Sequence, residues 1–295
     1  MTSESTARAD DDTGAGPAGE QPLFDYARWE AQLPELTRRY DNDHPFPHII
    51  LENLISPEIA KRAVEDFPSA DSGEWIQYRH VSEKKLGQNK RECIPPLHLS
   101  IIDEFNSPRF LAFLSKLTGI EGLVPDPGLE GGGLHQIPRL GFLNIHADFT
   151  AHVHQPLWAR RVNLLLYLNP DWKEEYGGHL ELWDRKMKGC TEKVLPVLNR
   201  CVIFSTNSDS FHGHPDPLTC PVGRTRKSLA LYYYTVEAVE PERHSTDYRA
   251  RPQDSRARAA FIWLDKKALR AYDFVKRRLG IDDRFVSRIL RRFSK

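Results

Sequence analysis

The feature of this 295-residue sequence that most constrains its fold is a succession of short apolar runs from about residue 133 to residue 237. The runs are rich in β-branched, aromatic and leucine residues, and turn formers such as Pro138 and Gly177-Gly178 separate them. Segments of this length and composition are typical of β-strands. Because no helical pattern lies between them, the sequence predicts an antiparallel sandwich or jelly roll rather than a parallel α/β sheet.

Helical patterns precede this strand-rich segment. Ser56 before Pro57 and Ser107 before Pro108 have the order of helix starts, and Gly119 is placed to end the second of these helices. Residues 24–41 also have a helical pattern, and we expect the proline within it to break or restart the helix.

Composition places few restrictions on the function. Lys+Arg and Asp+Glu both number 41, so the net charge gives no reason to expect a nucleic-acid partner. No segment approaches the roughly 20 consecutive apolar residues that a membrane span requires. The four cysteines show no C-x-x-C spacing, which favours free thiols in a reducing compartment.

The two ends of the chain differ from its middle. Residues 1–22 are acidic, rich in small residues and without a secretory signal pattern, which predicts a disordered leader and a cytoplasmic protein. We divide the remainder into a helical support region (23–130), a β core (131–240) and a basic helical extension (241–295). From Lys266 to Lys295 there are eleven Lys/Arg against three Asp. Without aromatic stacking residues this charge favours solvated helices that pack on the core or form a homodimer, rather than helices that bind nucleic acid or anionic lipid.

A His-x-Asp pair lies at the end of the apolar run in "LGFLNIHADFTAH". On an extended backbone, His146 and Asp148 project from the same face and can reach one ion. A second histidine from "FHGHPDP", His212 or His214, can complete the set. Two histidines and one carboxylate on one face of an octahedral ion are typical of non-haem Fe(II) oxygenases, which need the remaining positions for cosubstrate and dioxygen.

A cosubstrate such as 2-oxoglutarate chelates the iron through its keto acid and leaves a distal carboxylate in the interior. An arginine near the start of "TRKSLALYYYT" suits this carboxylate. A guanidinium binds a carboxylate as a rigid fork, and Ser228 would lie on the same strand face as Arg226. Arg224 is two residues earlier and follows a turn-like stretch. We favour Arg226 because it is nearer the apolar interior.

The segment from about residue 130 to residue 236 resembles the 2-oxoglutarate- and Fe(II)-dependent dioxygenases, in particular the prolyl-4-hydroxylase-like branch. The resemblance runs through "HAD", "RRVNLLLYLNPDW", "GGHLELWD", "NRCVIF", "FHGHP" and "RTRKSLALYYYT". It implies a mainly β protein, α+β overall, whose core is a double-stranded β-helix (jelly roll) with N-terminal supporting helices and a helical C-terminal extension. It also implies Fe(II), 2-oxoglutarate as cosubstrate and O2.

The resemblance also implies roles for individual residues. His146, Asp148 and His212 would bind iron, with His212 preferred over His214. For the cosubstrate it implies Arg226 and Tyr167 at the distal carboxylate and Leu180 as an apolar wall. Strand alternation adds Ser228 on the face of Arg226, and Asn163, which on a regular strand faces the same way as Tyr167 and is a candidate to contact the cosubstrate or the substrate. The spacing between His212 and Arg226 is longer than is usual in this branch. Residues near the ligands that are candidates for the substrate pocket are Gln136, Phe149 and Trp183.

The expected reaction is hydroxylation of an unactivated C–H bond, with release of succinate and CO2. The substrate would be a small molecule or an amino-acid or peptidyl group, and the small molecule is slightly favoured because no separate peptide-binding domain is evident. Two alternatives use the same scaffold: a cupin-like metal-dependent isomerase or epimerase, and a non-catalytic jelly-roll binding protein.

Overall fold

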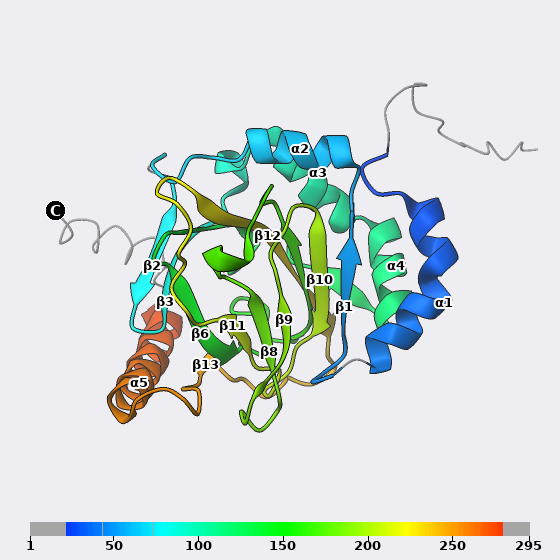
Figure 1. The fold of residues 1–295 in the computed structure, drawn as a ribbon. Helices are drawn as coiled ribbons and strands as arrows, with labels where there is room; N and C mark the ends of the chain where they lie inside the picture. Colours follow the sequence, from blue (N-terminus) through cyan, green and yellow to red (C-terminus); the bar gives the residue numbers. More distant parts are fainter. Residues whose placement is uncertain (1–21, 43, 73, 280–295) are drawn as a thin grey trace, which may run out of the picture.

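The computed structural model describes the backbone of residues 22–42, 44–72 and 74–279, with side chains as far as Lys267 (Figure 1). The predicted leader lies outside the described residues except for Pro22. The helices are α1 (Tyr26–Asn42), α2 (Pro57–Glu65), α3 (Pro96–Phe105), α4 (Pro108–Thr118) and α5 (Arg256–Leu279). The strands are β1 (His48–Glu52), β2 (Ile76–His80), β3 (Glu83–Gln88), β4 (Leu123–Pro125), β5 (Gly133–Pro138), β6 (Phe142–Ala147), β7 (Trp158–Tyr167), β8 (Leu180–Trp183), β9 (Cys190–Val194), β10 (Arg200–Ser205), β11 (His212–His214), β12 (Thr225–Val236) and β13 (Asp247–Tyr248).

The described strands pair antiparallel in one curled sheet, in the order β1-β10-β7-β12-β5-β3-β6-β11-β8-β9 (Figure 1). Beside this path, β2 pairs with β3, β4 with β12, and β13 with β6. The curl turns β6, β11 and β8 toward the face of β7 and β12, so that the sheet encloses an interior. The predicted fold class, a mainly β jelly-roll core with supporting helices, is confirmed.

Strand alternation divides the side chains of β7 between two cores. Leu164 and Leu166 are fully buried on the outer face, in the large cluster that also contains residues of α1, α3 and α4. Tyr167 points to the inner face, where it packs with Leu180 and Phe204. The helices therefore support the sheet from outside, and the interior is left for β-strand side chains.

Capping by Ser107 and Gly119 begins and ends α4 as the sequence predicts. The hydroxyl of Ser107 accepts a hydrogen bond from the backbone N–H of Phe110 at 3.1 Å. Gly119 has φ +69°, the left-handed conformation that glycine adopts most readily.

The expectation that Pro34 interrupts the first helix is wrong, because α1 runs without a break from Tyr26 to Asn42. A proline in a helix removes only one backbone N–H donor directly. Residues on both sides of it, Trp29, Leu36 and Tyr40, are buried against the same core. This shared packing outweighs the local cost of Pro34.

The C-terminal part of the chain packs beside the strand that carries His146. Tyr248 of β13 is the register partner of His146. In α5, the Asp265 carboxylate accepts a hydrogen bond from Ser82 Oγ at 2.5 Å and lies 3.0 Å from His80 Nδ1. Most of the basic residues of the extension lie beyond the described side chains, so the homodimer stays a prediction.

Two expectations from composition can be compared with the described residues. None of the helices in the described part of the chain is both long and apolar enough to cross a membrane. All four cysteines are described and are free thiols, as their spacing predicts.

Candidate functional site

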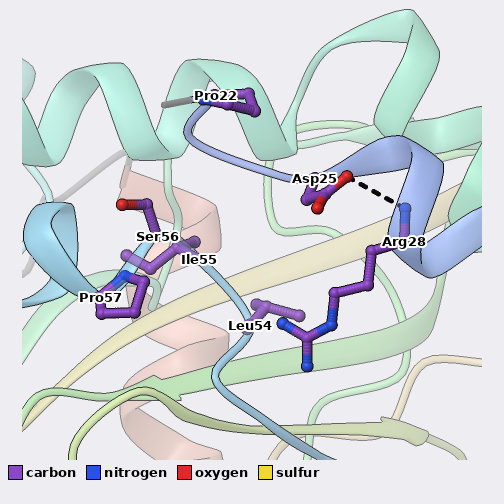
Figure 2. A pocket seen from close by; sticks show the side chains of 7 residues that line it. All are labelled: Pro22, Asp25, Arg28, Leu54, Ile55, Ser56 and Pro57. Atoms are coloured by element: carbon purple, nitrogen blue, oxygen red, sulfur yellow. Dashed lines mark hydrogen bonds between the residues drawn. The ribbon is translucent and has the colours of Figure 1, made fainter. Parts of the chain in front are cut away.

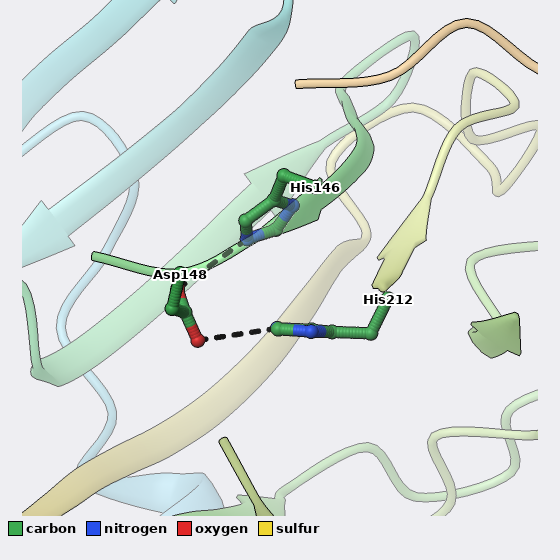
Figure 3. A group of neighbouring side chains, drawn as sticks. All are labelled: His146, Asp148 and His212. Atoms are coloured by element: carbon green, nitrogen blue, oxygen red, sulfur yellow. Dashed lines mark ion pairs between the residues drawn. The ribbon is translucent and has the colours of Figure 1, made fainter. Parts of the chain in front are cut away.

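His146, Asp148 and His212 converge in the interior of the curled sheet (Figure 3). His146 near the end of β6 is the antiparallel register partner of His212 on β11, and Asp148 follows β6 directly. One potential ligand atom of each residue lies within 4.8 Å of the others. His146 Nε2 is 3.5 Å from Asp148 Oδ1, and His212 Nε2 is 3.4 Å from Asp148 Oδ2. These two imidazoles and one carboxylate could hold one metal ion.

Hydrogen bonds to backbone carbonyls orient both imidazoles. His146 Nδ1 is 2.9 Å from the carbonyl oxygen of Asn144, and His212 Nδ1 is 2.9 Å from that of Ser210. Since a carbonyl can only accept, each Nδ1 carries the proton and each Nε2 keeps its lone pair for an ion. Burial lowers the pKa of His212 to about 4, which keeps its ring neutral near pH 7.

Arg160 and Asn163 fix the Asp148 carboxylate. The Asn163 amide donates to Asp148 Oδ2 at 2.7 Å, and Arg160 Nη2 lies 3.0 Å from the same oxygen. Arg160 also donates twice to Asn163 Oδ1, at 3.0 and 2.8 Å. Burial alone would raise the pKa of Asp148, but the charge of Arg160, together with the contacts to the two triad histidines, holds it well below its usual range.

Arg160 is a site residue that the sequence reasoning missed. It is three residues from Asn163, so the regular alternation of a strand would place the two on opposite faces. The pairing of β7 with β12 shifts register between Tyr233 and Tyr234, and this irregularity brings Arg160 inward. The one sequence feature that could have indicated a role for Arg160 is the Arg160-Arg161 pair in an otherwise apolar run.

Arg226 lies in the interior beside Tyr167. Its side chain is 4% exposed, its Nε donates to the carbonyl oxygen of Gly178 at 2.8 Å, and its Nη2 donates to the Tyr167 hydroxyl at 3.3 Å. No carboxylate within the described part of the chain forms an ion pair with Arg226. Burial lowers its pKa, although Tyr167 opposes this shift. A buried cation without an acidic partner suits an anionic ligand.

Gly178 permits the close approach of its backbone to Arg226. An added Cβ would lie 3.0 Å from Arg226 Cδ and 2.6 Å from Leu218 Cδ2, and Gly178 has φ +74°. The predicted turn at Gly177-Gly178 therefore has a second role, because its backbone packs directly against the Arg226 side chain.

Arg224, the alternative carboxylate partner, lies elsewhere. Its Nη2 donates to the carbonyl oxygen of Pro170, and its guanidinium lies over the rings of Trp172, at 5.9 Å, and Tyr176, at 5.4 Å. Of the two arginines, the structure thus places Arg226 in the interior and Arg224 in contact with the β7–β8 connection.

The other residues predicted for the cosubstrate lie near Tyr167. Ser228 is 3% exposed and is the register partner of Tyr167, and Leu180 packs in the same inner cluster as Tyr167. Asn163 instead makes its contacts with Asp148 and Arg160.

The three residues predicted for the substrate pocket are divided between the two faces of the sheet. Phe149 lies near the triad, with its ring centroid 4.5 Å from the Arg160 guanidinium carbon. Gln136 points outward, where its amide donates to the carbonyl oxygen of Pro68 at 3.1 Å. Trp183 packs with residues of β6 and with Phe211 in a cluster on the outer side of the sheet. The structure does not bring Gln136 or Trp183 to the triad, because each alternates with a neighbour that faces inward.

A separate surface pocket lies where α1 begins, next to the connection between β1 and α2 (Figure 2). Asp25 accepts a hydrogen bond from the backbone N–H of Arg28 there, and the Arg28 guanidinium donates to the carbonyl oxygens of Asn53 and Glu52. Its polar groups are thus engaged in holding α1, and none of the triad residues lines it.

Comparison with known proteins agrees with this site. Residues 132–234 match the family model described as the 2OG-Fe(II) oxygenase superfamily. Prolyl 3-hydroxylase OGFOD1 of Mus musculus is 25% identical over 205 residues, which are 67% of this chain and 34% of that protein. The chain therefore spans about a third of the length of this curated relative.

Two prolyl hydroxylases are among the solved structures that match this chain. A Pseudomonas putida prolyl-4-hydroxylase has 18% identity and a TM-score of 0.49, covering 68% of this chain and 98% of its own. The prolyl hydroxylase of Trichoplax adhaerens, in complex with a hypoxia inducible factor peptide fragment, has 17% identity and a TM-score of 0.48, covering 70% and 92%.

The region matched by the family model contains all three triad residues and both residues of the buried Arg226–Tyr167 pair. This confirms the resemblance found in the sequence. Within residues 132–234 the chain is similar to the 2OG-Fe(II) oxygenase superfamily.

Proposed function

We propose that this protein is a 2-oxoglutarate- and Fe(II)-dependent dioxygenase that hydroxylates an unactivated C–H bond. The observation that carries the proposal is the combination of the His146–Asp148–His212 triad with the buried Arg226, which has no acidic partner among the described residues. Two neutral imidazole nitrogens and one carboxylate fit Fe(II) and leave three coordination positions for other ligands. Bound Fe(II) and 2-oxoglutarate would supply dioxygen activation, with succinate and CO2 released as the substrate is hydroxylated.

The two ends of the interior suit different ligands. Arg226 and Tyr232 are six residues apart on the inner face of β12, which corresponds to about 20 Å along a strand. Tyr232 is the register partner of Asn163, which contacts the metal-ligand Asp148. The Arg226 end therefore suits the distal carboxylate of the cosubstrate, and the Tyr232 end suits the substrate.

The protein's own residues would orient and hold these groups. The carbonyl-bound Nδ1 atoms aim both histidine Nε2 atoms at the ion, and Asn163 with Arg160 prevents Asp148 from rotating. The burial of the site would exclude water from the reacting centre.

The substrate would be an amino-acid or peptidyl group, because the Tyr232 end of the site offers a donor for a carbonyl or carboxylate oxygen. Arg160 Nη1 is buried and has no hydrogen-bond partner among the described residues. The Arg160 guanidinium carbon lies 3.5 Å from the ring centroid of Tyr232 and 4.5 Å from that of Phe149, which would provide apolar contact. The named activity of the mouse relative, prolyl 3-hydroxylation, makes a prolyl residue the first candidate.

Succinate formation tests this proposal. The purified protein would be supplied with Fe(II), 2-oxoglutarate and O2, together with proline-containing peptides, free amino acids or small molecules, and product mass would be measured. We expect stoichiometric succinate and a substrate mass increase of one oxygen, both lost in Asp148→Ala. Conversion without consumption of 2-oxoglutarate would indicate an isomerase, and iron binding without turnover of any substrate would indicate a binding protein.

A further inference from the structure

His214 is a buried histidine whose polar atoms have no protein partner. Its side chain is 4% exposed, and neither ring nitrogen has a hydrogen-bond partner among the described residues. The neighbouring His212 differs, because its Nδ1 bonds the carbonyl oxygen of Ser210. A buried polar side chain without a partner is costly, and such groups in native proteins usually have a functional reason.

The strand pairing places His214 on the cosubstrate side of the triad. On β8, His212 is the register partner of Leu182 and Gly213 is that of Glu181, so His214 lies level with Leu180. Leu180 packs in the inner cluster with Tyr167, and Tyr167 contacts Arg226. An imidazole at this position can offer an N–H donor to a ligand.

The backbone holds His214 firmly in this position. The residue before it, Gly213, packs so closely on β6 that an added Cβ would lie 2.8 Å from the carbonyl oxygens of Leu143 and Asn144. The β11–β6 pairing also shifts register between His212 and His214, so the two rings need not project in parallel. The backbone at His214 is therefore held in place, which limits the positions that its ring can take.

We propose that His214 is a further binding residue for the cosubstrate, and that its ring N–H donates a hydrogen bond to the carboxylate held by Arg226 and Tyr167. This inference rests on the proposed function and adds a residue to its cosubstrate site. It makes His214 a selectivity residue for 2-oxo acids that carry a second carboxylate. An oxygen of that carboxylate would supply the partner that the ring lacks within the protein.

The experiment compares two ligands in four proteins under conditions without turnover. Isothermal titration with Mn(II) in place of Fe(II) would measure binding of 2-oxoglutarate and of 2-oxobutanoate, which chelates a metal but lacks the distal carboxylate. The proteins are the parent, His214→Leu, His214→Gln and the control His179→Leu. His179 lies next to Gly178 but pairs with Glu174 at 2.9 Å, away from the interior.

We expect His214→Leu to weaken 2-oxoglutarate binding on the order of 10-fold or more, the effect of losing a hydrogen bond to a charged group. Its affinity for 2-oxobutanoate and for Mn(II) should stay within about 3-fold of the parent, as should all affinities of His179→Leu. His214→Gln keeps an N–H donor near the position of Nε2 and should recover part of the loss. If His214→Leu does not fold, His214→Gln still tests the inference, because this substitution should change the affinity for 2-oxoglutarate but not that for 2-oxobutanoate.

Three results would overturn the assignment. They are unchanged 2-oxoglutarate binding in His214→Leu, an equal loss for both 2-oxo acids, and a loss of Mn(II) binding. If the parent itself bound Mn(II) but no 2-oxo acid, the proposed function would fail, and this result is distinct from all three.

Discussion

Replacing Arg226 by methionine should remove the response of this protein to 2-oxoglutarate without lowering the stability of the ligand-free protein. The side chain is buried, and its hydrogen bonds go to a carbonyl oxygen and a phenol rather than to a carboxylate. Desolvation of an ion costs several kcal/mol, and two hydrogen bonds return about 1.5–3 kcal/mol each at most. Methionine replaces the apolar stem of the arginine and has no charge to desolvate.

The ligand-bound protein should behave in the opposite way. A charge-assisted fork between guanidinium and carboxylate contributes about 3 kcal/mol, so its loss should weaken 2-oxoglutarate binding on the order of 100-fold. A concentration 100 times the dissociation constant stabilises the parent by about 2.7 kcal/mol. For a chain of 295 residues that corresponds to an increase in melting temperature of about 4 °C.

Thermal unfolding with Mn(II), with and without 2-oxoglutarate, measures both effects. Arg226→Met should show almost no ligand-induced shift, and its ligand-free melting temperature should equal or exceed that of the parent. The control Arg224→Met should keep the full shift, because Arg224 contacts the carbonyl oxygen of Pro170 instead. A ligand-free Arg226→Met protein that melts several degrees lower would refute the reasoning, as would a retained shift in that variant.

Three other changes test the metal site, the C-terminal contact and the outer core. Gly213→Ala should weaken Mn(II) binding on the order of 10-fold, because its Cβ would lie 2.8 Å from two carbonyl oxygens of β6 and would push β11 away; calorimetric titration measures this, and unchanged affinity would contradict it. Burial lowers the pKa of His80, but two neighbouring carboxylates outweigh this effect and raise it. Its stabilising contribution is therefore complete below the unfolded-state pKa of about 6.5 and is lost as the pH rises through the folded value. Urea unfolding across this range should show that decline in the parent and a flatter profile in His80→Gln, and identical profiles would count against it. Leu164→Ala should reduce the free energy of unfolding by about 2–5 kcal/mol, since Leu164 is fully buried between sheet and helices; a loss below about 1 kcal/mol in urea unfolding would show that the cavity collapses.

Local spacing was sufficient to predict the parts of this protein that depend on neighbouring residues in the chain. The two-residue separation of His146 and Asp148 places both on one side of an extended backbone, and turn residues mark the ends of the strands. Ser107 and Gly119 mark the ends of α4 for the same reason. Each of these features is decided within a few residues.

Features that depend on strand register could not be predicted in this way. Arg160 reaches Asp148 only because the β7–β12 pairing is irregular near Tyr234. Gln136 and Trp183 face outward because of the register of whole strands, which their own sequence does not determine. Pro34 was misjudged because tertiary packing outweighed a local preference.

The position of β1 in the sheet has a consequence for the synthesis of this protein. His48 pairs with Phe204, so a strand made early must remain unpaired until about 150 more residues have been added. At the usual rate of synthesis this interval lasts roughly 8–30 s. During it, the apolar side chains of β1 and of the early helices have no sheet to cover them. We therefore expect the nascent chain to depend on chaperones that bind exposed apolar segments, and to aggregate when the ribosome stalls before β10 has emerged.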